Sequence, residues 1–152
     1  MIALTDSGYY LLLIHILNRR TIRVGRRGRE TFPSGWYVYI GSARRNLGAR
    51  LDRHRRKTKR LHWHIDYLLA AAELKDICVV GFVSRGFTGG KANRETDSAP
   101  VTECGLAAWV AGLRGAALLH PGFGASDCRC PGHLYFFEKS PEKFLSEISS
   151  SF

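Results

Sequence analysis

Residues 8–17 (GYYLLLIHIL) form a short apolar segment that is rich in aromatic and branched side chains. A run of this length and composition is typical of a buried strand. Further strands are expected at residues 36–40 and 76–84, and HLYFFEK predicts a closing strand near the C-terminus. Helices are expected over residues 43–57, 62–74, 101–113 and 141–152. Because these elements alternate without a regular βαβ period, the sequence favours an α+β fold with a small, mainly antiparallel sheet flanked by helices.

A basic turn interrupts the chain between the first and second of these strands. The sequence TIRVGRRGRETF holds two short strand-like runs around the turn Gly25-Arg26-Arg27-Gly28, which predicts an added hairpin. Residues 85–100 (RGFTGGKANRETDSAP) are polar and rich in glycine, and predict a loop. We expect the hairpin tip (Arg26, Arg27, Arg29) and this loop to contact flanking DNA, with purely solvated side chains as the alternative.

The balance of charge indicates a polyanionic partner. The chain has 152 residues, 23 Lys and Arg against 13 Asp and Glu, and a net charge of +10. A length of this order predicts one domain over residues 1–152. Clustered cations gain from counterion release on phosphate backbones, so we expect nucleic acid rather than a membrane as the partner.

The N-terminal region has no basic segment followed by a small-residue cleavage site, and His15 interrupts an apolar run that is too short to span a bilayer. We therefore expect a cytoplasmic protein. Its four cysteines are then expected to be reduced, so that any special role for them involves metal or redox chemistry.

The helix expected at residues 43–57 contains two kinds of basic residue. Ala43, Leu47 and Leu51 define its apolar stripe, and Arg50 and His54 fall inside that stripe. A guanidinium directed toward the core needs a partner, either a structural ion pair or a phosphate in a polar cleft. The remaining basic residues lie mainly outside the stripe, on a face that is either solvated or follows a phosphate backbone; they include Arg44, Arg45, Arg53, Arg55 and Arg56.

Two tyrosines are expected beside this helix. In YVYIG, Tyr37 and Tyr39 share one face of a strand, with Ile40 opposite, and Gly41 is expected to end the strand and turn the chain into the helix. Pairing with the first strand would bring Tyr10 next to Tyr39. Tyrosines in strands are ordinarily packing residues, and that interpretation stays open for each of them alone.

The ordered set Gly8-Tyr9-Tyr10, Tyr39-Ile40-Gly41 and Arg50/His54 resembles the GIY-YIG nuclease superfamily. The resemblance to its Uri-type endonuclease branch extends over FPSGWYVYIGSA, LHWHIDYLL, TECGLA and GFGASDCRCPGHL, which together span most of the chain. It implies a three-stranded antiparallel sheet with flanking helices and metal-dependent hydrolysis of phosphodiesters.

The resemblance also implies a site. Glu103 corresponds to the metal-binding glutamate and would hold Mg²⁺ or Mn²⁺, although an acid in a first helical turn also complements the helix dipole. The implied catalytic residues are Tyr10, Tyr39, Arg50, His54 and Glu103. Nearby cations would lower the pKa of whichever tyrosine deprotonates water. We expect the nucleic acid to be DNA rather than RNA, and to be bound by Arg26, Arg27, Arg29, Arg44, Arg45, Arg53 and Lys57. The alternative is a non-catalytic nucleic-acid-binding module on the same scaffold.

Two further groups of residues carry metal-ligating or hydrogen-bonding side chains. In HWHID, His62 and Asp66 could bind metal or DNA, but a brace for the active-site helix by His64 or Asp66 explains the pattern better. The sequence CRCPGH offers Cys128, Cys130 and His133, and Cys104 is a candidate fourth ligand for a Cys₃His zinc site. The alternative is that these are small buried thiols without a metal.

Overall fold

A four-stranded antiparallel sheet forms the centre of the computed structural model, which describes residues 7–81, 102–125 and 128–151. The strands lie in the order β5-β1-β4-β6, and each neighbouring pair is antiparallel. The expected α+β class with a mainly antiparallel sheet is confirmed. The strands are β1 (Gly8–Ile16), β4 (Gly35–Ala43), β5 (Glu73–Gly81) and β6 (Leu134–Phe137).

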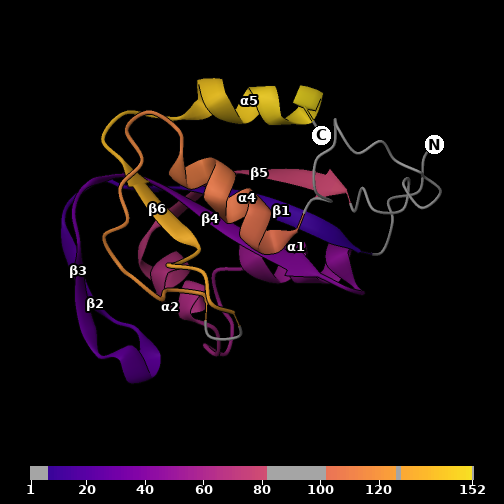
Figure 1. Ribbon diagram of the computed structural model, residues 1–152. Helices are drawn as coiled ribbons and strands as arrows, with labels where there is room; N and C mark the ends of the chain where they lie inside the picture. Colours follow the sequence, from indigo (N-terminus) through magenta and orange to yellow (C-terminus); the bar gives the residue numbers. More distant parts are fainter. Residues whose placement is uncertain (1–6, 82–101, 126–127, 152) are drawn as a thin grey trace.

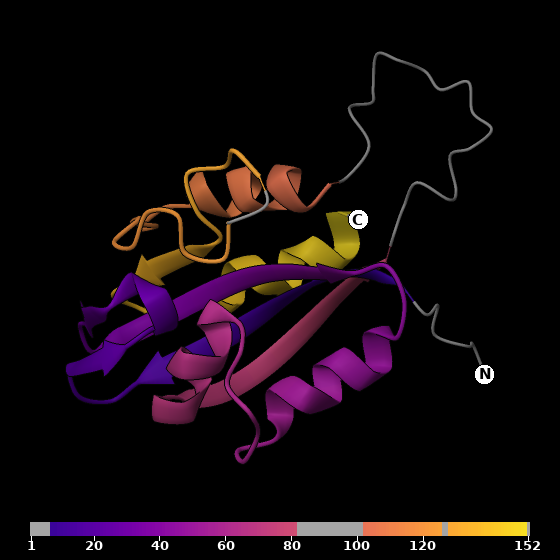
Figure 2. The same cartoon turned by 90° about the horizontal axis from the view of Figure 1, so that it is seen from below.

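Helices cover both faces of this sheet (Figures 1 and 2). Helices α1 (Leu47–Arg55) and α2 (His64–Ala71) lie on one face, and α4 (Glu103–Ala111) and α5 (Glu142–Ser151) lie on the other. β1 is buried between the two layers because its side chains are apolar on both faces: Leu12 and Ile14 pack with α1 and α2, and Leu11 and Leu13 with α4 and α5. Within the described residues, no helix is both long enough and apolar enough to cross a bilayer.

The basic hairpin is present as expected. It consists of β2 (Arg20–Arg23), one 3-10 turn (Gly25–Arg27) and β3 (Arg29–Phe32), and it forms a separate two-stranded sheet. Val24 and Phe32 are fully buried and join the hairpin to the core on the α1/α2 side. The basic tip of the hairpin is therefore fixed to the core through these two side chains.

Several element boundaries differ from the sequence prediction. β4 does not end at Gly41 but continues to Ala43, because β1 pairs with it as far as the Gly8–Ala43 partners. The helix that follows begins at Leu47, after Asn46 in a left-handed conformation, and not at residue 43. Likewise α2 ends at Ala71, because the chain beyond it pairs with β1 as the start of β5.

α4 is two residues shorter than expected at each end, because Thr102 and Gly112 cap it, and α5 begins one residue later than expected. Thr102, for example, caps α4 by accepting a hydrogen bond from the Gly105 amide. The glycine-rich segment at residues 85–100 lies outside the described residues.

The shortness of β6 leaves one end of the β4 edge open. β6 pairs with residues 36–39 only, whereas β4 continues to Ala43. After the Ile40 amide, which donates to the His133 carbonyl, the β4 edge has no neighbouring strand in the described structure. Side chains from both layers can therefore meet around the end of β4.

Candidate active site

A polar cavity of about 420 Å³ lies at this open edge. It brings together four of the five residues expected to be catalytic, namely Tyr10, Tyr39, Arg50 and Glu103, from β1, β4, α1 and α4. The fifth, His54, lies behind Tyr10. The remaining lining residues are Gly41, Ser42, His62, Trp63, His64 and Gly124.

The two tyrosine rings fit only because glycines lie beside them. Tyr10 is paired with Gly41, and a Cβ on Gly41 would lie 2.5 Å from the Cζ and Oη atoms of Tyr10. Gly41 therefore makes room for this ring, and does not serve as the strand end that the sequence analysis expected. Gly124 has a φ of +71°, and its Cβ would lie 2.8 Å from Cε1 of Tyr39. Each tyrosine ring therefore packs directly against the backbone of a glycine.

Tyr10 forms a hydrogen-bonded pair with His54. The Tyr10 hydroxyl lies 2.8 Å from Nε2 of His54, whose side chain is 2 % exposed. Burial and the neighbouring charge of Lys59 lower the pKa of His54 to about 4, so the imidazole is neutral at pH 7. Burial raises the pKa of Tyr10 to about 12, against the opposing effect of Arg50. Burial likewise raises the pKa of Tyr39. Arg50 lowers the pKa of both tyrosines, as expected of a nearby cation, but burial outweighs its effect.

Arg50 is held by contacts that leave its charge available. Its Nη1 donates to the Ser42 carbonyl at 2.7 Å, and its guanidinium lies 4.6 Å from the Trp63 ring centroid. Within the described residues, no carboxylate forms an ion pair with it. A partly buried cation of this kind at a cavity wall is suited to binding an anion such as phosphate.

Glu103 reaches the same cavity from the first turn of α4. The Ser42 hydroxyl donates to Oε1, and Nδ1 of His133 lies 2.9 Å from Oε2. Burial alone would raise the pKa of Glu103, but the contacts with His133 and Ser42 and the charge of Arg50 outweigh it, so the pKa is lowered. The carboxylate is ionised at neutral pH. An ionised carboxylate in a polar cavity fits Mg²⁺ or Mn²⁺, which keep most of their water and need few protein ligands.

Asp66 joins the two helices beneath the cavity, as one of the interpretations of HWHID expected. It is fully buried and accepts two hydrogen bonds from Arg53, at 2.8 and 2.9 Å, and one from each of the His62 and Trp63 amides. This network positions Trp63, over which Arg50 lies.

The residues expected to bind nucleic acid fall into two groups. Arg53 is paired with Asp66, Arg27 binds Glu30 and the Pro121 carbonyl, and Lys57 donates to two carbonyls at the end of α2. These three cations are engaged within the chain itself. The other four are exposed at the hairpin tip and between β4 and α1: Arg26, Arg29, Arg44 and Arg45.

The sequence analysis missed three contributors, Ser42, Trp63 and Gly124, and gave His64 only a bracing role. Nδ1 of His64 accepts a hydrogen bond from the Gly124 amide at 3.0 Å. Burial and the charge of Arg27 lower the pKa of His64 and so favour the neutral imidazole. Because Nδ1 accepts a hydrogen bond, this neutral form carries its proton on Nε2. The one indication in the sequence was that these residues belong to the motifs on which the resemblance rests. Sequence patterns could not pair them, because contacts such as that of His64 with Gly124 join segments 60 residues apart.

The expected cysteine group also comes together, next to this cavity. One ligand atom from each of four residues lies within 4.8 Å of all the others; the residues are Cys104, Cys128, Cys130 and His133. The three cysteines are free thiols. The group is therefore able to hold a metal ion.

Comparison with protein families gives a match over residues 9–152 to a family described as "Domain of unknown function DUF123". The chain belongs to this family. The DUF123 match includes every residue that lines the cavity and all four residues of the cysteine group. Searches of curated proteins and of solved structures gave no significant match.

The buried His54 makes the stability of this DUF123 chain dependent on pH. Its pKa of about 4 in the folded state lies below its value of 6.5 in the unfolded chain, so protons bind preferentially to the unfolded state. The stabilisation is complete above pH 6.5 and is lost as the pH falls toward 4. We expect His54→Gln to remove about 3 kcal/mol of pH dependence between pH 7 and 4.

Urea unfolding of the wild type and the variant at both pH values measures this difference. The other histidines whose pKa values are shifted, His64, His120 and His133, are common to both proteins and cancel. Parallel pH profiles of the two proteins would contradict the assignment to His54.

Proposed function

We propose that this chain is a divalent-metal-dependent endonuclease that hydrolyses phosphodiester bonds of nucleic acid, with DNA as the preferred substrate, at a site of GIY-YIG type. The observation that carries the proposal is the single cavity shared by Tyr10, Tyr39, Arg50 and Glu103, with His54 bonded to Tyr10. These residues come from elements on both faces of the sheet, and packing of the core does not require them to meet.

Glu103 would hold the metal ion. A bound Mg²⁺ or Mn²⁺ supplies positive charge at the phosphate and at the leaving oxygen. Arg50 binds a non-bridging phosphate oxygen through the N–H groups that the Ser42 carbonyl leaves free. The neutral His64, with its proton on Nε2, is a further donor on the cavity wall.

The Tyr10–His54 pair would move the proton of the attacking water. Because its pKa is about 12, Tyr10 is protonated at neutral pH and is not a base by itself. With the proton of the neutral imidazole on Nδ1, His54 would accept the Tyr10 proton at Nε2 while the phenol oxygen takes a proton from the water. The oxygen of that water would add to phosphorus as the bond to the leaving oxygen breaks. A solvent water would protonate the leaving oxygen, and His54 would return its proton to Tyr10, which passes one proton to the resulting hydroxide.

Exposed cations extend the binding surface on either side of the cavity. Arg44 and Arg45 lie between β4 and α1, and Arg26 and Arg29 lie at the hairpin. With a net charge of +10, this distribution suits a polyanion longer than one nucleotide.

The alternative, a non-catalytic nucleic-acid-binding module, explains the cations but not Glu103. An ionised carboxylate beside Arg50 in the same cavity repels phosphate unless a metal ion lies between them. The structure of the cavity therefore favours the enzyme.

One assay separates the two functions. The protein is incubated with single-stranded, duplex, flapped and branched DNA and with RNA, in the presence of Mg²⁺, Mn²⁺ or EDTA. We expect cleavage of at least one DNA form with either ion, and none with EDTA. Binding of these substrates without cleavage under any condition would identify the module instead.

A further inference from the structure

We propose that Cys104, Cys128, Cys130 and His133 bind one Zn²⁺, and that this ion, through the His133 imidazole, holds Glu103 in the cavity. The first part stands on the geometry of the four ligands alone. The second part rests on the proposed function, since it gives the zinc a role in positioning the residue that would bind the catalytic metal.

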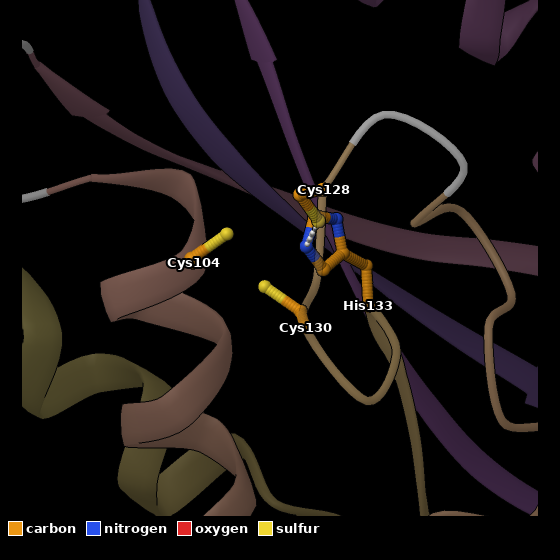
Figure 3. A group of neighbouring side chains, drawn as sticks. All are labelled: Cys104, Cys128, Cys130 and His133. Carbon is orange, nitrogen blue, oxygen red and sulfur yellow. Dashed lines mark hydrogen bonds between the residues drawn. The ribbon is translucent and has the colours of Figure 1, made fainter.

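The four ligands come from two separate parts of the chain. Cys104 lies in the first turn of α4, whereas the other three lie in the segment just before β6. Figure 3 shows the three sulfur atoms and the imidazole turned toward one another. Their ligand atoms lie within 4.8 Å of one another. In a tetrahedral zinc centre adjacent sulfurs lie roughly 3.8 Å apart, as Zn–S bonds of about 2.3 Å require, so only a small contraction is needed.

The donor set selects the metal. Three thiolates and one imidazole are soft ligands that suit zinc and do not suit Mg²⁺ or Mn²⁺. The fourth cysteine, Cys78, lies on β5 and does not belong to the group. The described residues between α4 and β6 form no helix and, apart from one bridge at Ala117, no strand pairing. A metal ion would tie this segment to α4.

His133 connects this group to the cavity. Its Nε2 lies 3.5 Å from Sγ of Cys128 and faces the cysteines, and its Nδ1 lies 2.9 Å from Oε2 of Glu103. A metal bound at Nε2 would leave the proton on Nδ1, and a small rotation of the ring or of the carboxylate would align this N–H with Oε2 for donation. Ser42 donates to the other carboxylate oxygen. Zinc would thus fix the tautomer of His133, and His133 and Ser42 together would fix Glu103.

The zinc site is tested on the full chain, purified without chelator under reducing conditions, by atomic emission and native mass spectrometry. We expect one zinc per chain in the wild type and in Cys78→Ser, and loss of stoichiometric zinc in Cys104→Ser and Cys130→Ser. In the wild type, replacement of the zinc by Co²⁺ should give the absorption bands of a tetrahedral, thiolate-bound ion, and this test needs no substitution. A wild type that takes up no stoichiometric zinc after loading, or that forms a Cys104 disulfide instead, would overturn the site.

The connection to Glu103 is tested in two independent ways. Long-range ¹H–¹⁵N spectra of the zinc-loaded wild type should show His133 protonated at Nδ1; protonation at Nε2 would refute the connection. In His133→Cys, a four-thiolate site can keep zinc while the imidazole is lost. We expect Mn²⁺ affinity at Glu103, measured by calorimetry without nucleic acid, to fall by roughly tenfold or more, as for other residues that orient metal ligands.

These outcomes separate the inference from the proposed function. Zinc binding and the Nδ1–H tautomer in a protein that cleaves no nucleic acid would leave the centre in place and remove the nuclease. Cleavage by a wild type that binds no zinc would support the nuclease and remove the zinc centre. Unchanged Mn²⁺ affinity in zinc-loaded His133→Cys would leave a zinc centre that is purely structural.

Discussion

Replacing Glu103 by glutamine is expected to abolish metal-dependent cleavage, with a loss of about 10³-fold or more in kcat. The amide keeps the size of the side chain but removes the negative charge that would attract Mg²⁺ or Mn²⁺. Arg50→Ala is expected to have a comparable effect, because it removes the cation that faces the phosphate. Initial rates of cleavage of the best substrate, measured over a range of Mg²⁺ concentrations, test both variants.

The control is binding of the same nucleic acid in EDTA. We expect Glu103→Gln to bind as tightly as the wild type or more tightly, because a charge that repels phosphate is gone. Arg50→Ala should bind more weakly. Both variants should still unfold cooperatively. Undiminished cleavage by either variant would show that the cavity is not the nuclease site.

Asp66→Ala is expected to destabilise the fold by about 3–5 kcal/mol, which is typical of breaking a buried ion pair by removing one partner. Asp66 is 0 % exposed, whereas the Arg53 side chain is 21 % exposed. The substitution leaves the Arg53 guanidinium and the backbone amides of His62 and Trp63 without their acceptor. Urea unfolding at pH 7 measures the change in the free energy of unfolding.

Asp52 on α1, next to Arg53, provides a matched control. It pairs with Arg55, and the two side chains are 74 % and 55 % exposed. Asp52→Ala is therefore expected to change stability by about 0.5 kcal/mol or less. Equal effects of the two substitutions would show that the buried network around Asp66 does not hold α1 and α2 together.

Local patterns in the sequence were sufficient for much of the fold and for the core of the candidate site. Alternation along YVYIG placed Tyr39 on one face and Ile40 on the other, as the structure confirms. Helical periodicity turned Arg50 and His54 inward from α1, and His54 is indeed buried. Periods of two and of about 3.6 residues per turn are properties of the backbone itself, so neighbours in sequence are enough to read them.

The boundaries of the elements required the tertiary structure. Gly41 has the same intrinsic freedom at a strand end as inside a strand; only pairing with β1 keeps β4 extended to Ala43, with the Tyr10 ring over Gly41. The partner of each arginine also depended on packing. Arg50 and Arg53 both lie over Trp63, but only Arg53 reaches the buried Asp66.

The sequence by itself determined the candidates for the chemistry: two tyrosines, an inward arginine and histidine, a glutamate on a later helix, and a cysteine-rich segment. Only the tertiary structure decided that the glutamate and the cysteine group share His133, whose two ring nitrogens face opposite neighbours. Glu103 and His133 are brought together where the pairing of the short β6 with β4 ends, at Leu134 and Tyr39, and leaves the edge of β4 open. Contacts of this kind depend on where strands end in space, and no local period in the chain encodes that.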